Sequence, residues 1–348
     1  MPKSALVLVN TGSPREPTPE AVREFLREFL SDDKVINLPR WFWLPILHGM
    51  VLPFRPKESA RRYQKIWMPG GSPQVVYMRS IAKKLRVELS DIPGVEIFCA
   101  FRYGEDSLKK ICSYLVKKGF DQADFLPMYP QYAVQTVGSV HEIVAKALKD
   151  SPIRRRFIEP YGGDSYAKLV ASSVKKYGTG SHLVISFHGV PEESIGPDNP
   201  YDKSCSKFAE LVASSLGLGP SEWSVAYQSK FGHCKWLGPE LNDVLTNLTG
   251  RGTRAIDIIS PSFSCDCIET LEEICVETKN VFLERGGNLF NYIPCPNDNG
   301  EAVRFYASLI RDFYKNPNEC ARFKSLCSSV ITGCPDCASG RTVLYANC

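Results

Sequence analysis

The chain has 348 residues, which is long enough to predict two lobes rather than one small core. Hydrophobic residues make up 43% of it and charged residues 23%, which excludes a wholly disordered protein. The net charge of +4 comes without a basic arm or an acidic tail, so nucleic acid is not expected as a partner.

Short β-branched segments alternate with helical patterns along most of the chain. The expected strands are residues 5–10, 95–101, 122–128, 182–187, 223–228, 255–260 and 288–293. The expected helices are residues 19–30, 107–118, 139–148, 166–177, 203–215, 240–249 and 268–285. This rhythm predicts an α/β fold with parallel sheets and helices on both faces, in which ligands sit beyond the carboxyl ends of the strands.

The composition changes at residues 151–156, where Ser-Pro precedes a run of three arginines. We therefore expect an N-terminal lobe of residues 1–150, a second lobe of residues 151–311 and a cysteine-rich extension of residues 312–348. The first ten residues indicate a β-strand rather than a secretory signal, and no run of 18 apolar residues predicts a membrane span. A cytosolic protein is the expectation, and cytosolic cysteines favour metal ligation or free thiols over disulfides.

Residues 41–54 form the most apolar part of the chain, interrupted by Pro45 and Pro53. Either this stretch packs into the core, or it forms an exposed lip that grips a large flat apolar ligand or dips into a membrane surface. Three adjacent aromatic residues, beginning with Trp41, favour the lip.

His188 follows a predicted strand and precedes a glycine, which permits close approach of other groups. An imidazole in that place can accept a proton or bind a metal near neutral pH. The alternative is a histidine that only caps a turn.

A second candidate site is acidic. If a helix begins near Asp266, then Asp266, Glu269, Glu273 and Glu277 lie on one face, where like charges destabilise by roughly 0.2–0.5 kcal/mol per pair. Asp266 with Glu269 fits an acidic N-cap and its box partner, which explains the first turn but not Glu273 and Glu277. The acidic face can instead relay protons or hold a hard cation such as Fe²⁺.

Two familiar chemistries are not expected. The sequence has no Walker-type loop, and its one dinucleotide-like string, residues 250–255, follows a helix and precedes a strand. That order is the reverse of the one that a dinucleotide site requires, so nicotinamide chemistry is not expected.

Several short strings together resemble the ferrochelatase family over about residues 4–310. In chain order they are LVNTGSP (8–14), GGSP (70–73), FRYG (101–104), PMYPQY (127–132), SFHGVP (186–191), YQSKFG (227–232), WLGP (236–239) and DCIETLEE (266–273). The resemblance implies two Rossmann-like lobes with parallel four-stranded sheets and a cleft between them. It also implies that Fe²⁺ is inserted into a porphyrin to give haem.

The resemblance also assigns residues to the pocket. His188 and Glu269 face each other and bind the iron or take the pyrrole protons, while Asp266 and Glu273 continue an acidic path for protons or metal. The implied porphyrin contacts are Tyr63, Ser72, Arg102 and Trp236, with Trp41 and Leu44 of the lip. Metallation replaces two pyrrole protons by one dication, so a base and an incomplete coordination sphere suit the reaction.

Five of the 13 cysteines lie in the last 29 residues. Four of them are separated by six, six and two residues: Cys320, Cys327, Cys334 and Cys337. Their spacing suits a metal centre, and Cys327, Cys334 and Cys337 resemble the tail ligands of ferrochelatases that carry a [2Fe–2S] cluster. The body ligand of those relatives would fall at residues 133–134, which are Ala-Val here, so Cys320 or a body cysteine completes the set. The alternatives are a zinc site and free thiols.

The sequence therefore predicts a bacterial-type ferrochelatase that uses protoporphyrin IX and touches a membrane surface. Coproporphyrin is the alternative substrate, and the apolar lip favours the less charged protoporphyrin. Two rival interpretations are a chelatase of another metal or tetrapyrrole, such as cobalt and an early corrinoid, and a haem-binding carrier without turnover.

Overall fold

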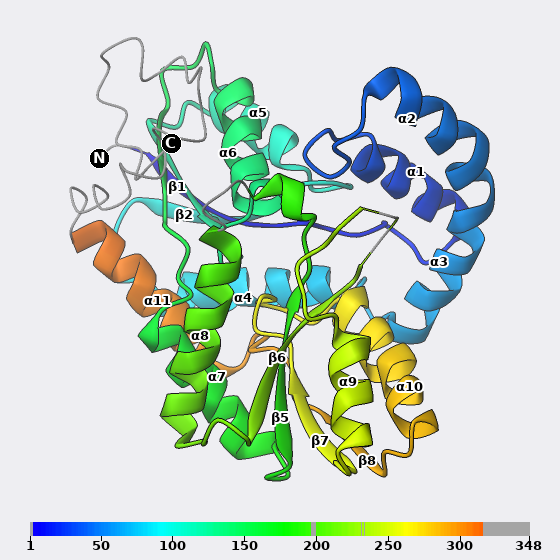
Figure 1. The fold of residues 1–348 in the computed structure, drawn as a ribbon. Coiled ribbons are helices and arrows are strands. Elements are labelled where there is room, and N and C mark those ends of the chain that lie inside the picture. Colours follow the sequence, from blue (N-terminus) through cyan, green and yellow to red (C-terminus); the bar gives the residue numbers. More distant parts are fainter. Residues whose placement is uncertain (1–2, 196–199, 231, 233, 316–348) are drawn as a thin grey trace.

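Two four-stranded parallel sheets form the centre of the protein (Figure 1). The computed structural model describes residues 3–195, 200–230, 232 and 234–315. In the first sheet the order is β2-β1-β3-β4, and its strands are Ser4–Asn10, Val95–Phe101, Gln122–Pro127 and Arg154–Phe157, numbered in chain order. In the second the order is β6-β5-β7-β8, with β5 to β8 at His182–His188, Trp223–Gln228, Ala255–Ile259 and Leu289–Tyr292. The two orders follow the same pattern, so the expected pair of Rossmann-like lobes is confirmed.

Strand β4 is the one element of the first sheet that the sequence pattern did not predict. It lies in the arginine-rich segment where a crossover was expected, and it pairs with β3 from Arg154 to Phe157. Arg156 is buried there because its guanidinium forms an ion pair with Asp124, 2.7 Å away on β3. A charged side chain hidden by its partner does not produce the apolar pattern of a strand, and the first sheet consequently extends beyond residue 150.

Helices cover both faces of each sheet. Those of the first sheet include α4 (Pro73–Glu88), α5 (Leu108–Lys117) and α6 (Ser139–Ala147), and those of the second include α7 (Asp164–Tyr177), α8 (Pro200–Leu216), α9 (Leu241–Gly250) and α10 (Lys279–Glu284). One continuous apolar core joins α4 of the first lobe to α7 and α8 of the second. Helix α11 (Gly300–Lys315) packs on both α4 and α7, so the lobes share a core rather than a flexible linker.

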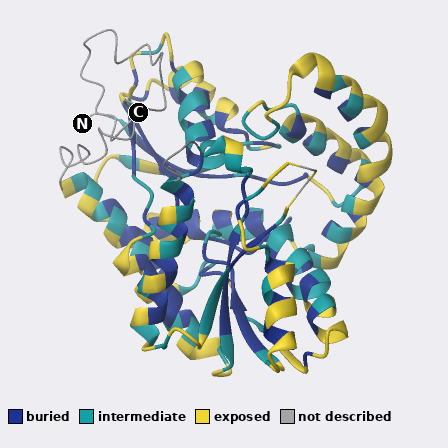
Figure 2. Ribbon diagram, viewed as in Figure 1, coloured by how far each residue is buried: buried dark blue, intermediate teal, exposed yellow. Residues whose placement is uncertain are grey.

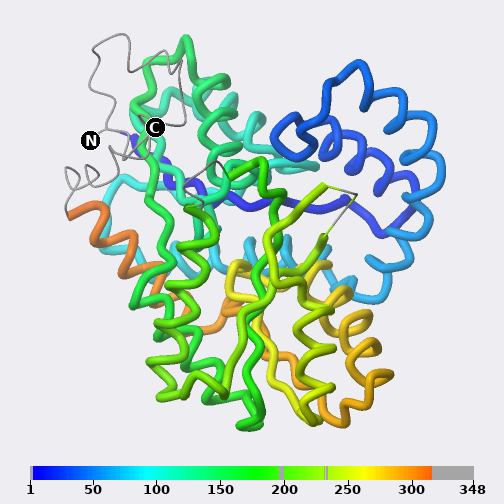
Figure 3. Tube along the Cα trace, in the orientation of Figure 1, coloured from blue at the N-terminus to red at the C-terminus, as the bar shows by residue number. Residues whose placement is uncertain are grey.

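A helical arm projects beside the first sheet, on the side of the molecule away from α11 (Figure 3). It consists of α1 (Pro19–Leu30), α2 (Arg40–Ile46), the short π-helix η1 (Leu47–Val51) and α3 (Leu52–Ile66). Of the two prolines that interrupt the apolar pattern, Pro45 lies inside α2 and Pro53 lies in the first turn of α3.

The apolar stretch 41–54 lies in this arm. Some of its side chains pack into the core and others are exposed. Trp43 and Leu47 are buried against α1, and the indole Nε1 of Trp43 donates to Leu30 O at 2.7 Å. Trp41 and Phe54 are 79% and 77% exposed. One side of the stretch is therefore core and the other is an exposed lip, on the largely exposed outer surface of the arm (Figure 2). Within the described residues, no helix has the length and apolarity that a membrane crossing requires.

Candidate active site

Polar groups from both lobes meet beyond the carboxyl ends of β1 and β7. Asn10, the last residue of β1, donates from Nδ2 to Ser264 Oγ at 3.3 Å, and Ser264 belongs to the segment that follows β7. The side chain of Gln74 on α4 donates to Asn10 Oδ1 at 3.1 Å and accepts from Gly12 N at 2.8 Å. These buried bonds hold the loop after β1 against the second lobe at the sheet edge where ligands of this architecture bind.

His188 is the last residue of β5, as the sequence predicted, and its backbone is fixed on two sides. Its amide donates to Ser262 Oγ at 3.2 Å, and its carbonyl accepts from Tyr201 Oη at 2.8 Å. On the ring, Nδ1 lies 2.6 Å from Gly189 O. A carbonyl only accepts, so Nδ1 carries the hydrogen and Nε2 keeps a lone pair for a proton or a metal.

Gly189, the residue after His188, has no side chain and so leaves room for the ring of Trp236. A Cβ added at Gly189 would lie 3.1 Å from Cε3 of the Trp236 ring and 2.8 Å from Gln228 O. The indole Nε1 of Trp236 donates a hydrogen bond to Cys234 Sγ at 3.1 Å. The indole ring therefore packs on the backbone of the residue that follows His188.

Gln228, which sequence reasoning missed, links the strand of His188 to the acidic helix through strand pairing and a side-chain hydrogen bond. It is the last residue of β6 and the register partner of His188. Its side-chain Oε1 accepts from Ser186 Oγ at 2.9 Å and from Ser260 Oγ at 3.0 Å, and its Nε2 donates to Glu269 O at 3.2 Å. The only sequence signal for this role was its position at the end of a strand.

The acidic segment is a π-helix, η4, which extends over Glu269–Thr278 and continues into α10. π-Helical turns are rare and occur frequently at functional sites. η4 begins at Glu269, after Ile268, which makes no side-chain cap bond, so the alternative of an acidic N-cap at Asp266 does not hold. The wider turn also changes which residues share a face, and the acidic residues lie in different environments.

Asp266 precedes the helix, and its carboxylate accepts four hydrogen bonds from the protein. Its carboxylate accepts from Tyr292 Oη at 2.5 Å, Asn297 Nδ2 at 2.6 Å, Thr270 Oγ1 at 3.1 Å and Cys295 N at 3.3 Å. Four bonds to a carboxylate that is 3% exposed indicate a structural anchor for the start of η4.

Glu273 has the environment of a proton acceptor. Burial raises its pKa to about 7, an effect that the neighbouring Glu269 increases and the hydrogen bond from Ser229 opposes. Ser229 Oγ donates to Glu273 Oε2 at 2.7 Å, and Ser229 itself has a φ of 66°. A carboxyl with this pKa exchanges protons near neutral pH.

Glu269 shares its surroundings with two tyrosines and a thiol. Burial, and next the charge of Glu269, raise the pKa of Tyr63 well above its usual value, and burial raises the pKa of the Cys267 thiol in the same way. Tyr129 is partly buried, burial and also the charge of Glu269 raise its pKa, and its Oη forms a hydrogen bond with Thr11 Oγ1 at 2.8 Å. Tyr63, an expected porphyrin contact, thus lies near Glu269, as do Tyr129 and Cys267, which sequence reasoning did not single out.

Two other expected porphyrin contacts have their polar atoms engaged by the protein. Ser72 is the N-cap of α4, where its Oγ accepts from Val75 N at 3.4 Å and bonds to Ser13 Oγ at 2.6 Å. Arg102 forms a charged hydrogen bond with Asp32 and donates from Nε to Ser139 Oγ at 2.6 Å. Their polar groups therefore join neighbouring elements, α4 to the loop after β1 and the end of β2 to the segment after α1.

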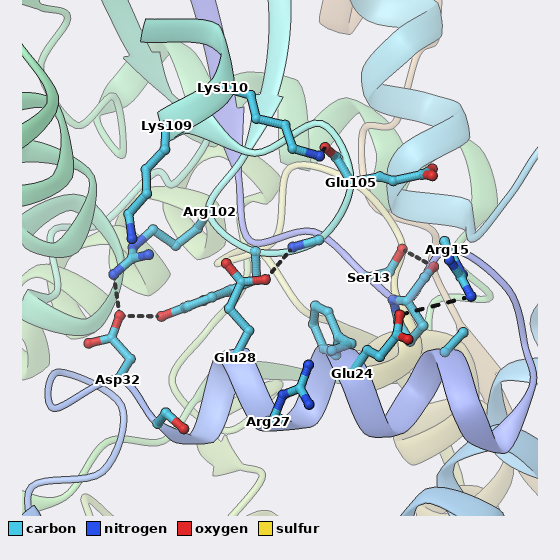
Figure 4. Close-up of a pocket in the computed structure, with 16 residues that line it drawn as sticks. Ser13, Arg15, Glu24, Arg27, Glu28, Asp32, Arg102, Glu105, Lys109 and Lys110 are labelled. Atoms are coloured by element: carbon cyan, nitrogen blue, oxygen red, sulfur yellow. Dashed lines mark hydrogen bonds and ion pairs between the residues drawn. The ribbon is translucent and has the colours of Figure 1, made fainter. Parts of the chain in front are cut away.

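Arg102 also lines a cavity of about 650 Å³ between α1 and the loop after β2 (Figure 4). Glu24 and Glu28 reach into it from α1, and Lys109 and Lys110 come from the start of α5 on the opposite side. Its lining includes Arg102 and Ser13, but neither His188 nor Glu269.

The expected metal ligands in the tail, Cys320, Cys327, Cys334 and Cys337, lie outside the described residues. In the described part of the chain, no three histidine, cysteine or acidic side chains are grouped to hold a metal ion.

The paired lobes define a protein with the chelatase fold. SirB from Bacillus subtilis, in a structure with Fe³⁺, aligns with a TM-score of 0.56 over 91% of this chain and 98% of its own, at 13% identity. A second SirB structure, of a sirohydrochlorin chelatase in complex with cobalt, gives a TM-score of 0.54. At this identity the likeness establishes the fold alone.

The chain belongs to the ferrochelatase family, whose sequence model matches residues 3–313. A ferrochelatase of Vibrio atlanticus is 41% identical over 315 residues, which are 88% of this chain and 97% of that relative. One of Vibrio parahaemolyticus is 40% identical over 316 residues. The protein is therefore a chelatase of the lyase class that serves haem synthesis by inserting iron into a porphyrin. The family match ends before Cys320, so it does not extend to the cysteine-rich tail.

Proposed function

We propose that the chain inserts Fe²⁺ into protoporphyrin IX between His188 and Glu269. The observation that carries this proposal is the bond from His188 Nδ1 to Gly189 O, which leaves Nε2 as a base at the end of β5. Gln228 supports the pairing, because it is the register partner of His188 and donates to the backbone of Glu269.

The reaction releases two pyrrole protons as one Fe²⁺ enters the ring, and the product keeps the charge of the porphyrin. His188 Nε2 accepts a proton from the ring, and Glu269 stabilises the cation that results or the incoming iron. One imidazole and one carboxylate leave the coordination sphere incomplete, so the metal can pass from the protein to the four nitrogens.

Glu273 is the proposed exit for the protons. It lies one turn beyond Glu269 in η4, and its pKa of about 7 lets it take a proton and release it to solvent at neutral pH. Asp266, first expected in this path, is held by four donors, which supports a structural role instead.

The choice of protoporphyrin over coproporphyrin rests on the exposed lip. Trp41 and Phe54 offer apolar surface, and Leu44 is partly buried against the apolar core of the arm. Two vinyl groups suit such a surface better than two additional propionates, because burying a carboxylate without a partner is costly.

Replacing the base tests the function. We expect His188→Ala to lower kcat for iron insertion at least about a hundredfold, the usual contribution of a general base. His182→Ala is the matched control, since His182 begins the same strand and bonds to Ser224 Oγ at 2.9 Å. Formation of metalloporphyrin is followed by absorption under anaerobic conditions with protoporphyrin and coproporphyrin.

A non-catalytic haem carrier would respond differently. If the wild-type chain takes up preformed haem but forms none from porphyrin and Fe²⁺, the catalytic proposal fails. Preferential turnover of coproporphyrin would overturn only the substrate choice.

We further propose that the tail carries a [2Fe–2S] cluster with Cys320, Cys327, Cys334 and Cys337 as ligands. Iron–sulfur ligands are thiolates. Burial raises the pKa of the body thiols Cys99 and Cys112 to about 12, which disfavours these two as the fourth ligand.

The proposed cluster predicts visible sulfur-to-iron absorption in the anaerobically purified protein. The double variant Cys334→Ser/Cys337→Ser should lose these bands together with the bound iron and sulfide. Cys234→Ser, at an exposed cysteine of the body, should retain them. A zinc content of one ion per chain without visible bands would contradict the cluster.

Finally, we propose a cytoplasmic protein that associates with the membrane surface through its lip. The exposed side chains of Trp41, Phe42, Met50 and Phe54 support this placement, because such side chains enter the interfacial region of a bilayer without spanning it.

A further inference from the structure

Helix α3 of the arm packs across the boundary between the lobes onto the acidic π-helix η4. The apolar part of this contact joins Ala60 and Tyr63 of α3 to Ile268, which precedes η4. Tyr63 faces the surroundings of Glu269 from α3, as the effect of that carboxylate on its pKa indicates. The relative position of α3 and η4 therefore decides how two walls of the candidate site face each other.

Beside this apolar contact lies a buried carboxylate that the sequence did not single out. Glu272 has a side chain only 2% exposed, and both cations that neutralise it come from α3. Lys65 Nζ lies 3.0 Å from Glu272 Oε1, and Arg62 NH1 lies 3.7 Å from Glu272 Oε2. That second oxygen has no hydrogen-bond partner among the described residues. The buried charge of Glu272 is stabilised only while α3 keeps its two cations in place.

Arg62 is itself held in place by two further carboxylates. Its NH2 lies 2.7 Å from Glu277 Oε1 on η4 and 2.9 Å from Glu58 Oε1 on α3. Burial would lower the pKa of Arg62, but Glu277 and Glu272 raise it, so the guanidinium stays charged. The ion pairs of Arg62 and Lys65 with Glu272 and Glu277 are called the α3–η4 latch below.

We propose that Glu272 is a positioning residue, which through the α3–η4 latch holds η4 against α3 and so fixes Glu269 opposite Tyr63. An apolar contact tolerates small sliding, whereas a buried carboxylate between two cations has one favourable register. The inference rests on the proposed role of Glu269 and adds to it a residue that acts without touching substrate.

A double-mutant cycle tests the latch. We expect Glu272→Gln and Lys65→Met each to lower kcat for iron insertion about tenfold, and the double variant to lose little more than either alone. The dissociation constant for porphyrin, measured by fluorescence quenching without iron, should change less than about threefold, because the lip is intact. Glu272→Asp keeps the charge and should recover part of kcat. Glu284→Gln removes an exposed carboxylate of α10 and should change neither quantity.

Hydrogen exchange of residues 269–278 supplies a readout that does not depend on activity. Faster exchange there in Glu272→Gln, together with non-additive losses of kcat, supports the latch. Additive losses, or faster exchange with unchanged kcat, overturn it. Failure of the proposed function is recognised separately, since it appears as Glu269→Gln retaining full iron insertion in an otherwise wild-type chain.

Discussion

At the scale of single residues, the site depends on groups whose ordinary chemistry is altered by their neighbours. The carbonyl of Gly189 selects the tautomer of His188, and burial in η4 brings the pKa of Glu273 to about 7. Neither change requires an unusual residue. Each follows from where a common side chain is buried and what it is bonded to.

Glu273 makes a prediction about pH. Its pKa is raised from 4.5 to about 7, so between these values the folded state binds more protons than the unfolded state, and stability falls as pH rises. We expect Glu273→Gln to flatten this dependence and to raise the free energy of unfolding at pH 8 by up to about 3 kcal/mol. Urea unfolding from pH 4 to pH 8 measures it.

The same variant affects turnover. The wild-type rate should increase through pH 7 as Glu273 loses its proton, and Glu273→Gln should abolish that increase while lowering the rate at pH 8. Glu284→Gln serves as the control. An unchanged pH profile would contradict the role of Glu273 as a proton acceptor.

At the scale of elements, one side of the apolar segment 41–54 packs inside the arm and stabilises it, while the other side is exposed to solvent. Trp43 is bonded and buried, while Trp41, two residues away, is exposed. Helical periodicity produces this division, because neighbours in sequence point to different sides of the helix.

The exposed side predicts binding to membranes. We expect Trp41→Ser/Phe54→Ser to reduce binding to vesicles that contain anionic lipid at least about tenfold, since each buried aromatic side chain contributes about 1.5–3 kcal/mol. Flotation of the protein with vesicles measures this. Tyr177→Ser, at an exposed aromatic residue of α7, should bind like the wild type, and equal loss in both variants would contradict the proposal.

At the scale of the whole molecule, α11 fastens the last described turn of the chain to the first sheet. Tyr314 Oη donates to Asp124 Oδ2 at 2.7 Å, and Asp124 is fully buried beside Arg156. Phe313 stacks on the guanidinium of Arg156, with 4.5 Å from Cζ to the ring centre. The second lobe thereby returns to the first through a buried ion pair.

Breaking this ion pair should destabilise the protein strongly. We expect Arg156→Met to lower the free energy of unfolding by about 3–5 kcal/mol, because it leaves the buried carboxylate of Asp124 without its cation. Tyr314→Phe removes one hydrogen bond to a charged group and should lower it by about 1.5–3 kcal/mol. Equilibrium unfolding in urea measures both, and equal effects would contradict the ranking.

The amino-acid sequence by itself determined the fold class, seven of the eight strands that the structure describes, and the place of His188 at the end of a strand, because strand periodicity is set by neighbouring residues. The roles of Glu269 and Tyr63 follow from the family resemblance and stay predictions. The tertiary structure decided the rest. The sequence pattern did not reveal strand β4, because the carboxylate that neutralises Arg156 comes from another strand. The roles of Gln228, Glu272 and Asp266 depend on contacts between residues distant in the chain. Such contacts, and the pKa values that follow from them, exist only once the two lobes are packed together.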